Sequence, residues 1–182
     1  VGTASPRRKA QLLSRRPDLD IRLIRGNVQS RLQKIEDKDF DATLLAAAGL
    51  DRLEMNAVGY DISDDVMLPA PAQGAIGIEI RSDDDHMAQL LAAISHAPTY
   101  RAVSAERAFL AELTADCHSP VAALAVIDGE RLVLRAEILL PDGSERVADV
   151  QMFDVDDLFQ AAMLAQKLLK EASPELAAIF GR

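Results

Sequence analysis

This 182-residue sequence has one cysteine, no tryptophan and few aromatic residues, which make up 4% of the chain. A single cysteine cannot form an internal disulfide, which fits a reducing compartment such as the cytoplasm. No apolar run reaches the roughly 18 residues needed to cross a membrane, and residues 1–5 lack the features of a secretory signal. The sequence has no initiator methionine and opens on what reads as the end of a strand, so we expect a fragment or a cleaved product. With 49% hydrophobic residues it can build one large domain or two small ones.

The net charge of −9 is unevenly distributed. Residues 1–31 carry eight Lys and Arg against two Asp, which is a net charge of +6, so the remainder of the chain carries −15. Such asymmetry indicates a local anion site on an otherwise acidic protein. Nucleic acid is a poor candidate ligand, because most of the surface would repel phosphate.

The first part of the chain alternates strand and helix patterns, which is typical of an α/β layer with a parallel sheet. Ser5 is a good N-cap and Pro6 suits the first helical position, so a helix is predicted from there to about Arg16. The residues that follow predict a strand at 20–24, a helix at 28–38 and a buried parallel strand at 41–48 that leads into a short helix.

The later part of the chain has a different pattern. Pro69-Ala70-Pro71 reads as a stiff linker, followed by a strand at 74–80 and by helices at 86–95 and 99–113. Asp128-Gly129 and Asp142-Gly143 are hairpin turn sequences. They join predicted strands at 121–127, 131–140 and 146–153, and an amphipathic helix is predicted at 156–172. From about residue 98 onward we therefore expect a small α+β domain with an antiparallel sheet.

Four arginines fall where a predicted strand ends or the next helix begins: Arg7, Arg8, Arg25 and Arg31. Ligands of open parallel sheets bind at the carboxyl ends of the strands, so these guanidinium groups are predicted to converge on one crevice. Guanidinium pairs with carboxylate in a two-pronged geometry, and phosphate would fit as well. A solvated basic face is the alternative, and it is adopted for the arginines that no turn places near the others: Arg15, Arg16 and Arg22.

Cys117 lies in a predicted loop beside Asp116, His118 and Ser119. A lone cysteine is more often a small buried hydrophobe than a reactive group, but these polar neighbours are not a core setting. Both interpretations stay open on the residues alone. No metal site is expected, because one cysteine and three scattered histidines lack ligand spacing.

Five segments, in order along nearly the whole chain, resemble the hydroxymethylbilane synthase (porphobilinogen deaminase) family. They are Gly2–Arg8 (GTASPRR), Arg25–Arg31 (RGNVQSR), Asp41–Arg52 (DATLLAAAGLDR), Pro69–Glu79 (PAPAQGAIGIE), and Glu106-Arg107 together with Cys117 and Pro120-Val121-Ala122. One such motif would be weak evidence, whereas five collinear motifs are strong evidence.

The resemblance implies an enzyme that joins four porphobilinogen molecules head to tail, releases ammonia at each step and yields hydroxymethylbilane for tetrapyrrole synthesis. It implies a dipyrromethane cofactor on Cys117 through a thioether, a monomeric complete enzyme, and no nucleic-acid or membrane partner. The carboxylates of cofactor and substrate would be held by Arg7, Arg8, Arg25, Arg31 and Arg52. Polar cofactor contacts would come from Thr3, Ser5 and Gln73, and Leu45 and Ala46 would line the site.

The family has three domains, two resembling periplasmic binding proteins and a small third one bearing the cysteine. By this resemblance residues 1–70 are the arginine-bearing second domain, incomplete at its N-terminus, residues 71–95 return to the first domain, and residues 96–182 are the cysteine-bearing domain. The catalytic Asp of the family lies in the N-terminal domain, so no catalytic residue is expected here and the fragment alone is expected to be inactive. The sequence departs from the family pattern at Asp116 and Ser119. A non-catalytic carboxylate- or anion-binding α/β module is the alternative function.

Overall fold

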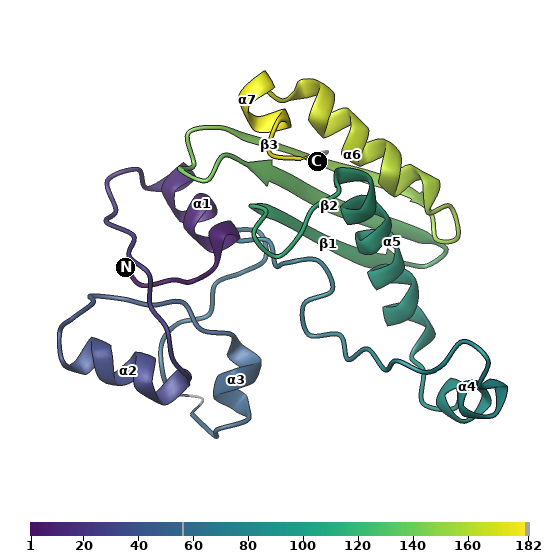
Figure 1. Cartoon of the computed structure of the whole chain (residues 1–182), viewed down its shortest axis with the longest axis horizontal. Coiled ribbons are helices and arrows are strands. Elements are labelled where there is room, and N and C mark those ends of the chain that lie inside the picture. Colours follow the sequence, from purple (N-terminus) through teal and green to yellow (C-terminus); the bar gives the residue numbers. More distant parts are fainter. Residues whose placement is uncertain (56, 181–182) are drawn as a thin grey trace.

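The computed structural model describes residues 1–55 and 57–180 as a mixed α/β chain in two parts (Figure 1). The N-terminal part holds three helices, α1 (Pro6–Arg15), α2 (Val28–Glu36) and α3 (Ala47–Asp51). An arm with α4 (Asp85–Ala92) leads to α5 (Ala97–Leu113). The C-terminal part continues with β1 (Val121–Asp128), β2 (Arg131–Leu139), β3 (Arg146–Asp154), α6 (Phe159–Glu171) and α7 (Pro174–Ala177).

The C-terminal part is an antiparallel sheet in the order β1-β2-β3, with α5 and α6 packed on one face (Figure 1). Phe109, Leu134 and Leu164 are fully buried between the helices and the sheet. The predicted α+β domain is confirmed, with strands within one residue of the expected bounds and hairpin turns at Gly129 and Gly143.

Successive residues of β2 point to opposite faces of the sheet, as the period of a strand requires. Leu132, Leu134, Ala136 and Ile138 belong to the core that the helices cover. The alternate residues therefore lie on the face that α5 and α6 leave uncovered, and Glu137, a charged residue, is among them. This uncovered face is where the sheet meets the N-terminal part.

In the N-terminal part, three chain segments run parallel through single-residue bridges, Gly2 with Arg22 and Gly2 with Thr43. Gly2 N–H donates to the carbonyl of Ala42 (2.8 Å), and Arg22 N–H donates to the carbonyl of Val1 (2.9 Å). The parallel arrangement is as predicted, but the strands expected at 20–24 and 41–48 reduce to these bridges. Residues 46–48 are exposed, so the prediction of a buried strand there is wrong. A parallel sheet forms where both of its faces are covered. Here only three short chain segments meet, so no continuous sheet forms.

The first two helices of this part, α1 and α2, begin at residues whose side chains cap them, whereas α3 has no side-chain cap. Ser5 Oγ accepts the N–H of Arg8 (3.3 Å), and Asn27 Oδ1 accepts the N–H of Ser30 (2.9 Å). Both side chains satisfy a backbone donor that has no partner within the helix. The predicted helices at 6–16 and 28–38 are confirmed with slightly earlier ends.

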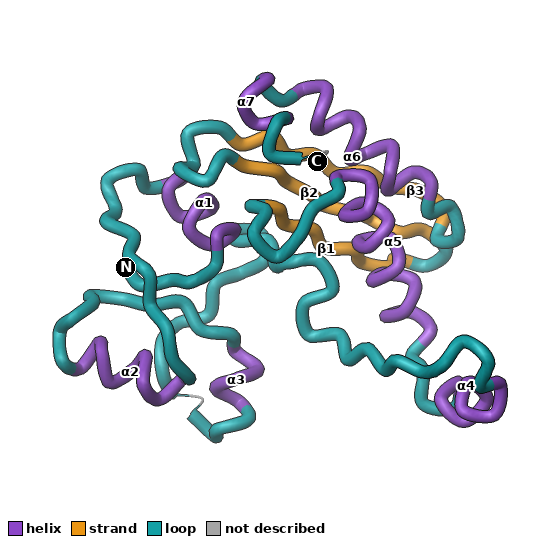
Figure 2. Tube along the Cα trace, in the orientation of Figure 1, coloured by secondary structure: helices purple, strands orange, loops and turns teal. Residues whose placement is uncertain are grey.

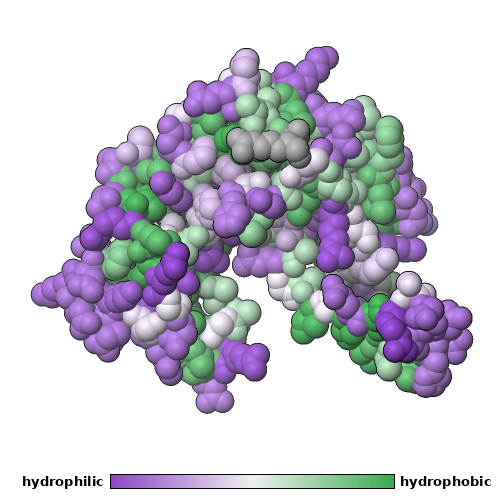
Figure 3. Space-filling model, in the orientation of Figure 1, coloured by the Kyte–Doolittle hydropathy of each residue, from purple (hydrophilic) through white to green (hydrophobic). Residues whose placement is uncertain are grey.

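Residues 74–80 form no strand, so that prediction is wrong. The segment is extended and exposed, with Ile76 92% accessible, and it leads to α4, which projects away from the rest of the chain (Figures 2 and 3). Its apolar residues favour a strand, but a strand also requires a neighbouring backbone to bond with. Among the residues described, no helix is long and apolar enough to span a membrane.

The two parts of the chain meet where the β2–β3 hairpin loop touches the end of α1. Gly143 is buried in that loop with φ +74°. A Cβ on Gly143 would lie 2.4 Å from the backbone nitrogen of Ser14 and 2.8 Å from the carbonyl oxygen of Ala10. Only glycine permits this approach, because backbone atoms of a helix cannot move aside as a flexible side chain does.

We expect Gly143→Ala to lower the free energy of unfolding by about 2–4 kcal/mol, the sum of left-handed backbone strain and overpacking. Gly129→Ala is the matched control, because Gly129 also has a positive φ (+63°) in a hairpin turn but has open space around it. Gly129→Ala should lower the free energy of unfolding by only about 1–2 kcal/mol, because it introduces the backbone strain alone. Urea denaturation of both variants measures the difference. Equal losses of unfolding free energy in the two variants would contradict the close packing of the hairpin loop on α1.

Candidate functional site

Three turns that carry polar and charged residues lie at the same edge of the N-terminal part. The bridges from Gly2 to Arg22 and to Thr43 are parallel, so the chain leaves all three segments in one direction. The turns that follow lead into α1, α2 and α3. This is the edge at which α/β proteins bind ligands.

Arg7, in the first turn of α1, is buried, with 6% of its surface exposed. Its Nη1 donates to Oε1 of Gln11 (2.8 Å) and to the carbonyl of Leu68, and its Nη2 donates to Oε1 of Gln73 (3.4 Å). All three acceptors are neutral. The pKa of Arg7 is lowered to about 10, mainly by burial and also by the nearby charge of Arg8, while the charge of Glu137 opposes the shift. Arg7 is therefore a buried cation without a hydrogen-bonded carboxylate.

Arg8 and Arg31 are half-buried and close enough to repel each other. Burial lowers the pKa of Arg8, and the charge of Arg31 lowers it further. Arg8 Nη1 donates to the carbonyl of Leu44 (3.2 Å), and Arg31 Nε donates to the carbonyl of Gly26 (2.8 Å). Within the described part of the chain neither arginine is in an ion pair. Together with Arg7 they form the arginine cluster, a group of three guanidiniums that make no ion pair with any residue the structure describes.

The structure brings only some of the other residues predicted to contact the cofactor directly to this cluster. Gln73 touches Arg7 directly, and Thr3 is buried with its Oγ1 accepting the N–H of Ser5 (3.2 Å). Leu45 and Ala46 follow the carbonyl that Arg8 contacts, and Ala46 precedes α3.

Two predicted arginines are not brought into the cluster. Arg25 and Arg52 are exposed, and in residues 1–55 and 57–180 their side chains make no hydrogen bond or ion pair. Of the three assigned to a solvated face, Arg16 pairs with Asp18 (2.7 Å), and Arg22 lies over the ring of Phe40 (4.6 Å). The third, Arg15, is exposed as assigned, and it also borders the pocket described below.

Cys117 is exposed in the loop between α5 and β1. Asp116 Oδ1 accepts the N–H of His118 (2.8 Å) and the hydroxyl of Ser119 (3.1 Å), and Asp116 N–H donates back to Ser119 Oγ (3.0 Å). These hydrogen bonds hold the pKa of Asp116 below its usual range. The two departures from the family pattern thus form one closed turn around Cys117. Across the residues described, no hydrogen bond joins this turn to the arginine cluster.

Two buried carboxylates that sequence reasoning did not assign to the site join the two parts of the chain. Glu106 Oε2 accepts the N–H of Ala72 (2.5 Å), and its Oε1 accepts the N–H of Ala125 (2.8 Å). Burial raises the pKa of Glu106, although both hydrogen bonds oppose the shift. Glu137 Oε1 accepts Nε2 of Gln11 (2.5 Å). The spacing of Arg7 and Gln11, four residues apart on one helix face, was the available signal for Gln11.

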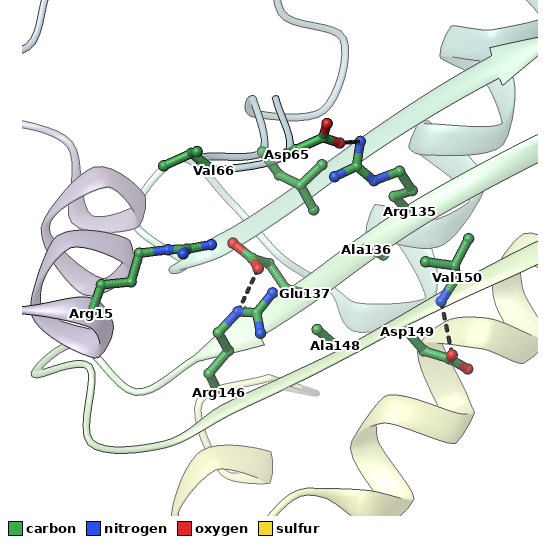
Figure 4. A pocket seen from close by; sticks show the side chains of 11 residues that line it. Arg15, Asp65, Val66, Arg135, Ala136, Glu137, Arg146, Ala148, Asp149 and Val150 are labelled. Carbon is green, nitrogen blue, oxygen red and sulfur yellow. Dashed lines mark hydrogen bonds and ion pairs between the residues drawn. The ribbon is translucent and has the colours of Figure 1, made fainter. Parts of the chain in front are cut away.

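A pocket of about 260 Å³ lies between α1, the chain near Leu68 and the uncovered face of the sheet (Figure 4). Arginine and acidic side chains alternate around it, so it has little net charge, unlike the arginine cluster. Its charged lining residues are Arg15, Asp65, Arg135, Glu137, Arg146 and Asp149. The described residues contain no group of three side chains placed to hold a metal ion.

Half-buried guanidiniums that face a ligand-binding edge without carboxylate partners are typical of proteins that bind anionic small molecules. The geometry therefore describes a mixed α/β chain with an arginine-rich edge.

Two family models match the chain and together cover most of it. Porphobilinogen deaminase, dipyromethane cofactor binding domain, matches residues 1–89, and Porphobilinogen deaminase, C-terminal domain, matches residues 100–173. The chain belongs to the porphobilinogen deaminase family. The resemblance predicted from the five motifs is thereby confirmed.

Curated relatives agree with this assignment. The chain is 51% identical over 181 residues to a porphobilinogen deaminase of Sphingopyxis alaskensis, covering 99% of this chain and 57% of that protein. It is 56% identical over 149 residues to one of Paracoccus denitrificans (81% and 48%) and 47% identical over 178 residues to one of Moorella thermoacetica (97% and 57%). The chain thus spans about half the length of the curated relatives it matches.

Proposed function

We propose that this chain is the cofactor-bearing part of a hydroxymethylbilane synthase. The complete enzyme would be a cytoplasmic, monomeric transferase that joins four porphobilinogen molecules head to tail, releases ammonia and yields hydroxymethylbilane for haem or chlorophyll synthesis. Membership of the porphobilinogen deaminase family supports the reaction.

The arginine cluster is the observation that carries the proposal. Each pyrrole unit of substrate and product bears two carboxylates, so negative charge accumulates as the chain grows. Arg7, Arg8 and Arg31 offer three guanidiniums whose present partners are neutral oxygens. Guanidinium stays charged at any working pH and matches carboxylate geometry, so this cluster fits a growing polycarboxylate.

The residues present also fit a covalently held dipyrromethane. Cys117 is exposed, so its Sγ is accessible for a thioether bond. When bound, the cofactor would prime the growing chain and remain on the enzyme. Arg7, Arg8, Arg25, Arg31 and Arg52 would hold its carboxylates and those of the substrate, Thr3, Ser5 and Gln73 would add polar contacts, and Leu45 and Ala46 would line the site.

The division into domains follows the same family pattern. Residues 1–70 would belong to a second domain related to periplasmic binding proteins, residues 71–95 would return to a first domain, and residues 96–182 would form the third. The parallel bridges at Gly2 support the α/β character of the second domain, and the exposed apolar side chains at 76, 78 and 80 support a missing neighbour for the returning segment.

We expect Arg8→Gln to weaken the affinity of the chain for porphobilinogen at least about tenfold, because it removes a charge-assisted contact to a carboxylate. Isothermal titration calorimetry with porphobilinogen measures the dissociation constant. Arg16→Gln is the matched control, since Arg16 is exposed and already paired with Asp18. An Arg8→Gln variant that binds as tightly as the unaltered chain would contradict the assigned site.

A further inference from the structure

Four side chains form a continuous line of hydrogen bonds from β3 to the arginine cluster. Arg146 Nε donates to Glu137 Oε2 (2.7 Å), Gln11 Nε2 donates to Glu137 Oε1 (2.5 Å), and Arg7 Nη1 donates to Gln11 Oε1 (2.8 Å). Arg7, Gln11 and Glu137 are all nearly inaccessible, with 3–6% of their surfaces exposed. Contacts of this kind, between charged or amide groups in a low-dielectric interior, are strong and directional.

The carboxylate of Glu137 determines which end of the Gln11 amide faces Arg7. An ionised carboxylate only accepts hydrogen bonds, and so does the carbonyl of Leu68, the second group that Gln11 Nε2 contacts (3.0 Å). Both require the NH₂ end of the amide. The oxygen end is left for Arg7, which only donates. Reversing the amide would direct its NH₂ group at a guanidinium and its oxygen at a carboxylate.

Glu137 also acts on Arg7 through its charge. Among the charges near Arg7, that of Arg8 lowers its pKa and that of Glu137 raises it, so Glu137 favours the cationic form that burial opposes. Arg146 is exposed and pairs with the other carboxylate oxygen, as Figure 4 shows. The carboxylate of Glu137 is thus held by Gln11 of the N-terminal part and by Arg146 of the C-terminal part.

The contacts of Arg7 differ in strength, and the longest is to Gln73, a residue proposed above to contact the cofactor. Its Nη1 is held by Gln11 and by Leu68, whereas its Nη2 reaches Gln73 only at 3.4 Å. A ligand carboxylate can therefore replace the Gln73 contact while Nη1 stays in place. The guanidinium would be oriented before the ligand arrives, which reduces the entropy lost on binding.

We propose that Glu137 is a positioning residue for ligand binding, which acts through Gln11 to hold the buried guanidinium of Arg7 toward the carboxylates of the cofactor. The inference rests on the proposed function for the identity of the ligand. It adds that a residue of the cysteine-bearing part, 126 positions from Gln11 in the sequence, sets the geometry of an arginine in the other part.

The test compares Glu137→Gln with Asp149→Asn in the complete 182-residue chain. Asp149 lines the same pocket and pairs with Lys167 (2.6 Å), so its variant removes the same charge nearby without touching Gln11. Nitrogen-15 NMR of the ligand-free chain reports hydrogen exchange of the Arg7 guanidinium. We expect Glu137→Gln to accelerate this exchange about tenfold, the equivalent of one hydrogen bond to a charged group, and Asp149→Asn to leave it unchanged.

A second measurement separates positioning from general stability. Backbone amides of β2 and β3 should keep their protection in Glu137→Gln, and the dissociation constant for porphobilinogen should rise about tenfold. In a Gln11→Met background, Glu137→Gln should change neither quantity further, because the path to Arg7 is already interrupted.

The outcomes distinguish a failure of the inference about Glu137 from a failure of the proposed function. Equal effects of Glu137→Gln and Asp149→Asn on Arg7, additive effects in the double variant, or an accelerated exchange spread over the whole sheet would each overturn the inference. An unaltered chain that fails to bind porphobilinogen would count against the proposed function, while the exchange of Arg7 would still decide whether Glu137 positions it.

Discussion

The 182-residue chain alone is expected to form no detectable hydroxymethylbilane from porphobilinogen. Loss of ammonia from porphobilinogen leaves a cation, which requires a carboxylate nearby for proton transfer and electrostatic stabilisation, and a positioned acid–base group contributes about 10²–10⁴-fold to a rate. By the family resemblance, none of Asp18, Asp20, Asp41 and Asp51 is expected to occupy the catalytic position. Asp18 and Asp20 are engaged with Arg16 and Arg22 on the surface. The arginine cluster would bind the substrate through its guanidiniums, but among the described residues no carboxylate is hydrogen-bonded to it that could activate the substrate.

The measurement is a stopped assay of porphobilinogen consumption, run with the chain alone and with the chain mixed with the N-terminal part of the Sphingopyxis alaskensis relative. The alignment covers 99% of this chain and 57% of that relative, so the relative has further sequence outside the aligned part. Activity should appear only in the mixture, and the same N-terminal part without this chain is the control. Turnover by the chain alone would show that a carboxylate within it serves the reaction.

The C-terminal part could be predicted almost completely from the sequence. Asp-Gly pairs mark the two hairpins, alternating apolar residues mark the strands, and α5 and α6 supply the core that covers one face. These signals are local, because each strand pairs with its neighbour in the chain. The structure therefore departs from prediction by a few residues at the ends of elements and by the short helix α7, which was not predicted.

The N-terminal part was less predictable for a physical reason. The segments at 20–24, 41–48 and 74–80 have strand-like composition, but strands depend on partners that the sequence pattern does not specify. The first two reach one bridge each, and the third pairs with nothing in the described chain. Helices α1 and α2 were predicted correctly, because their caps and hydrogen bonds lie within the segment itself.

The site shows the same limit. The positions of Arg7, Arg8 and Arg31 at the turns correctly predicted that their charges lie close enough to interact. These positions did not predict that Arg7 is buried. Its burial depends on Leu68 and Gln73 and on Glu137, which lies in another part of the fold. Contacts of such long sequence separation leave no periodic trace, so only the structure shows which side chains orient the cluster.

Cys117→Ser is expected to abolish both covalent cofactor attachment and activity in the complete enzyme reconstituted from this chain and the N-terminal part. Thiolates are strong nucleophiles and serine hydroxyls are weak ones unless a base activates them, and the turn around Cys117 directs its acidic side chain into hydrogen bonds with His118 and Ser119. Intact mass after denaturation should show a dipyrromethane adduct on the unaltered chain and none on the variant.

The single cysteine makes a second readout unambiguous, because every free thiol in the chain is Cys117. Thiol titration in denaturant should find no free thiol in the loaded chain and one per molecule in the unloaded chain, and His118→Ala serves as a control that alters the loop but keeps the sulfur. The result also separates the two functions considered for this chain. A non-catalytic anion-binding module needs only the arginine cluster, so Cys117→Ser would leave its affinity for porphobilinogen unchanged and no adduct would exist to lose. An adduct that disappears with the sulfur, together with an arginine cluster that still binds the free substrate, would show that the chain holds its ligand in two ways, by charge in one part and by a covalent bond in the other.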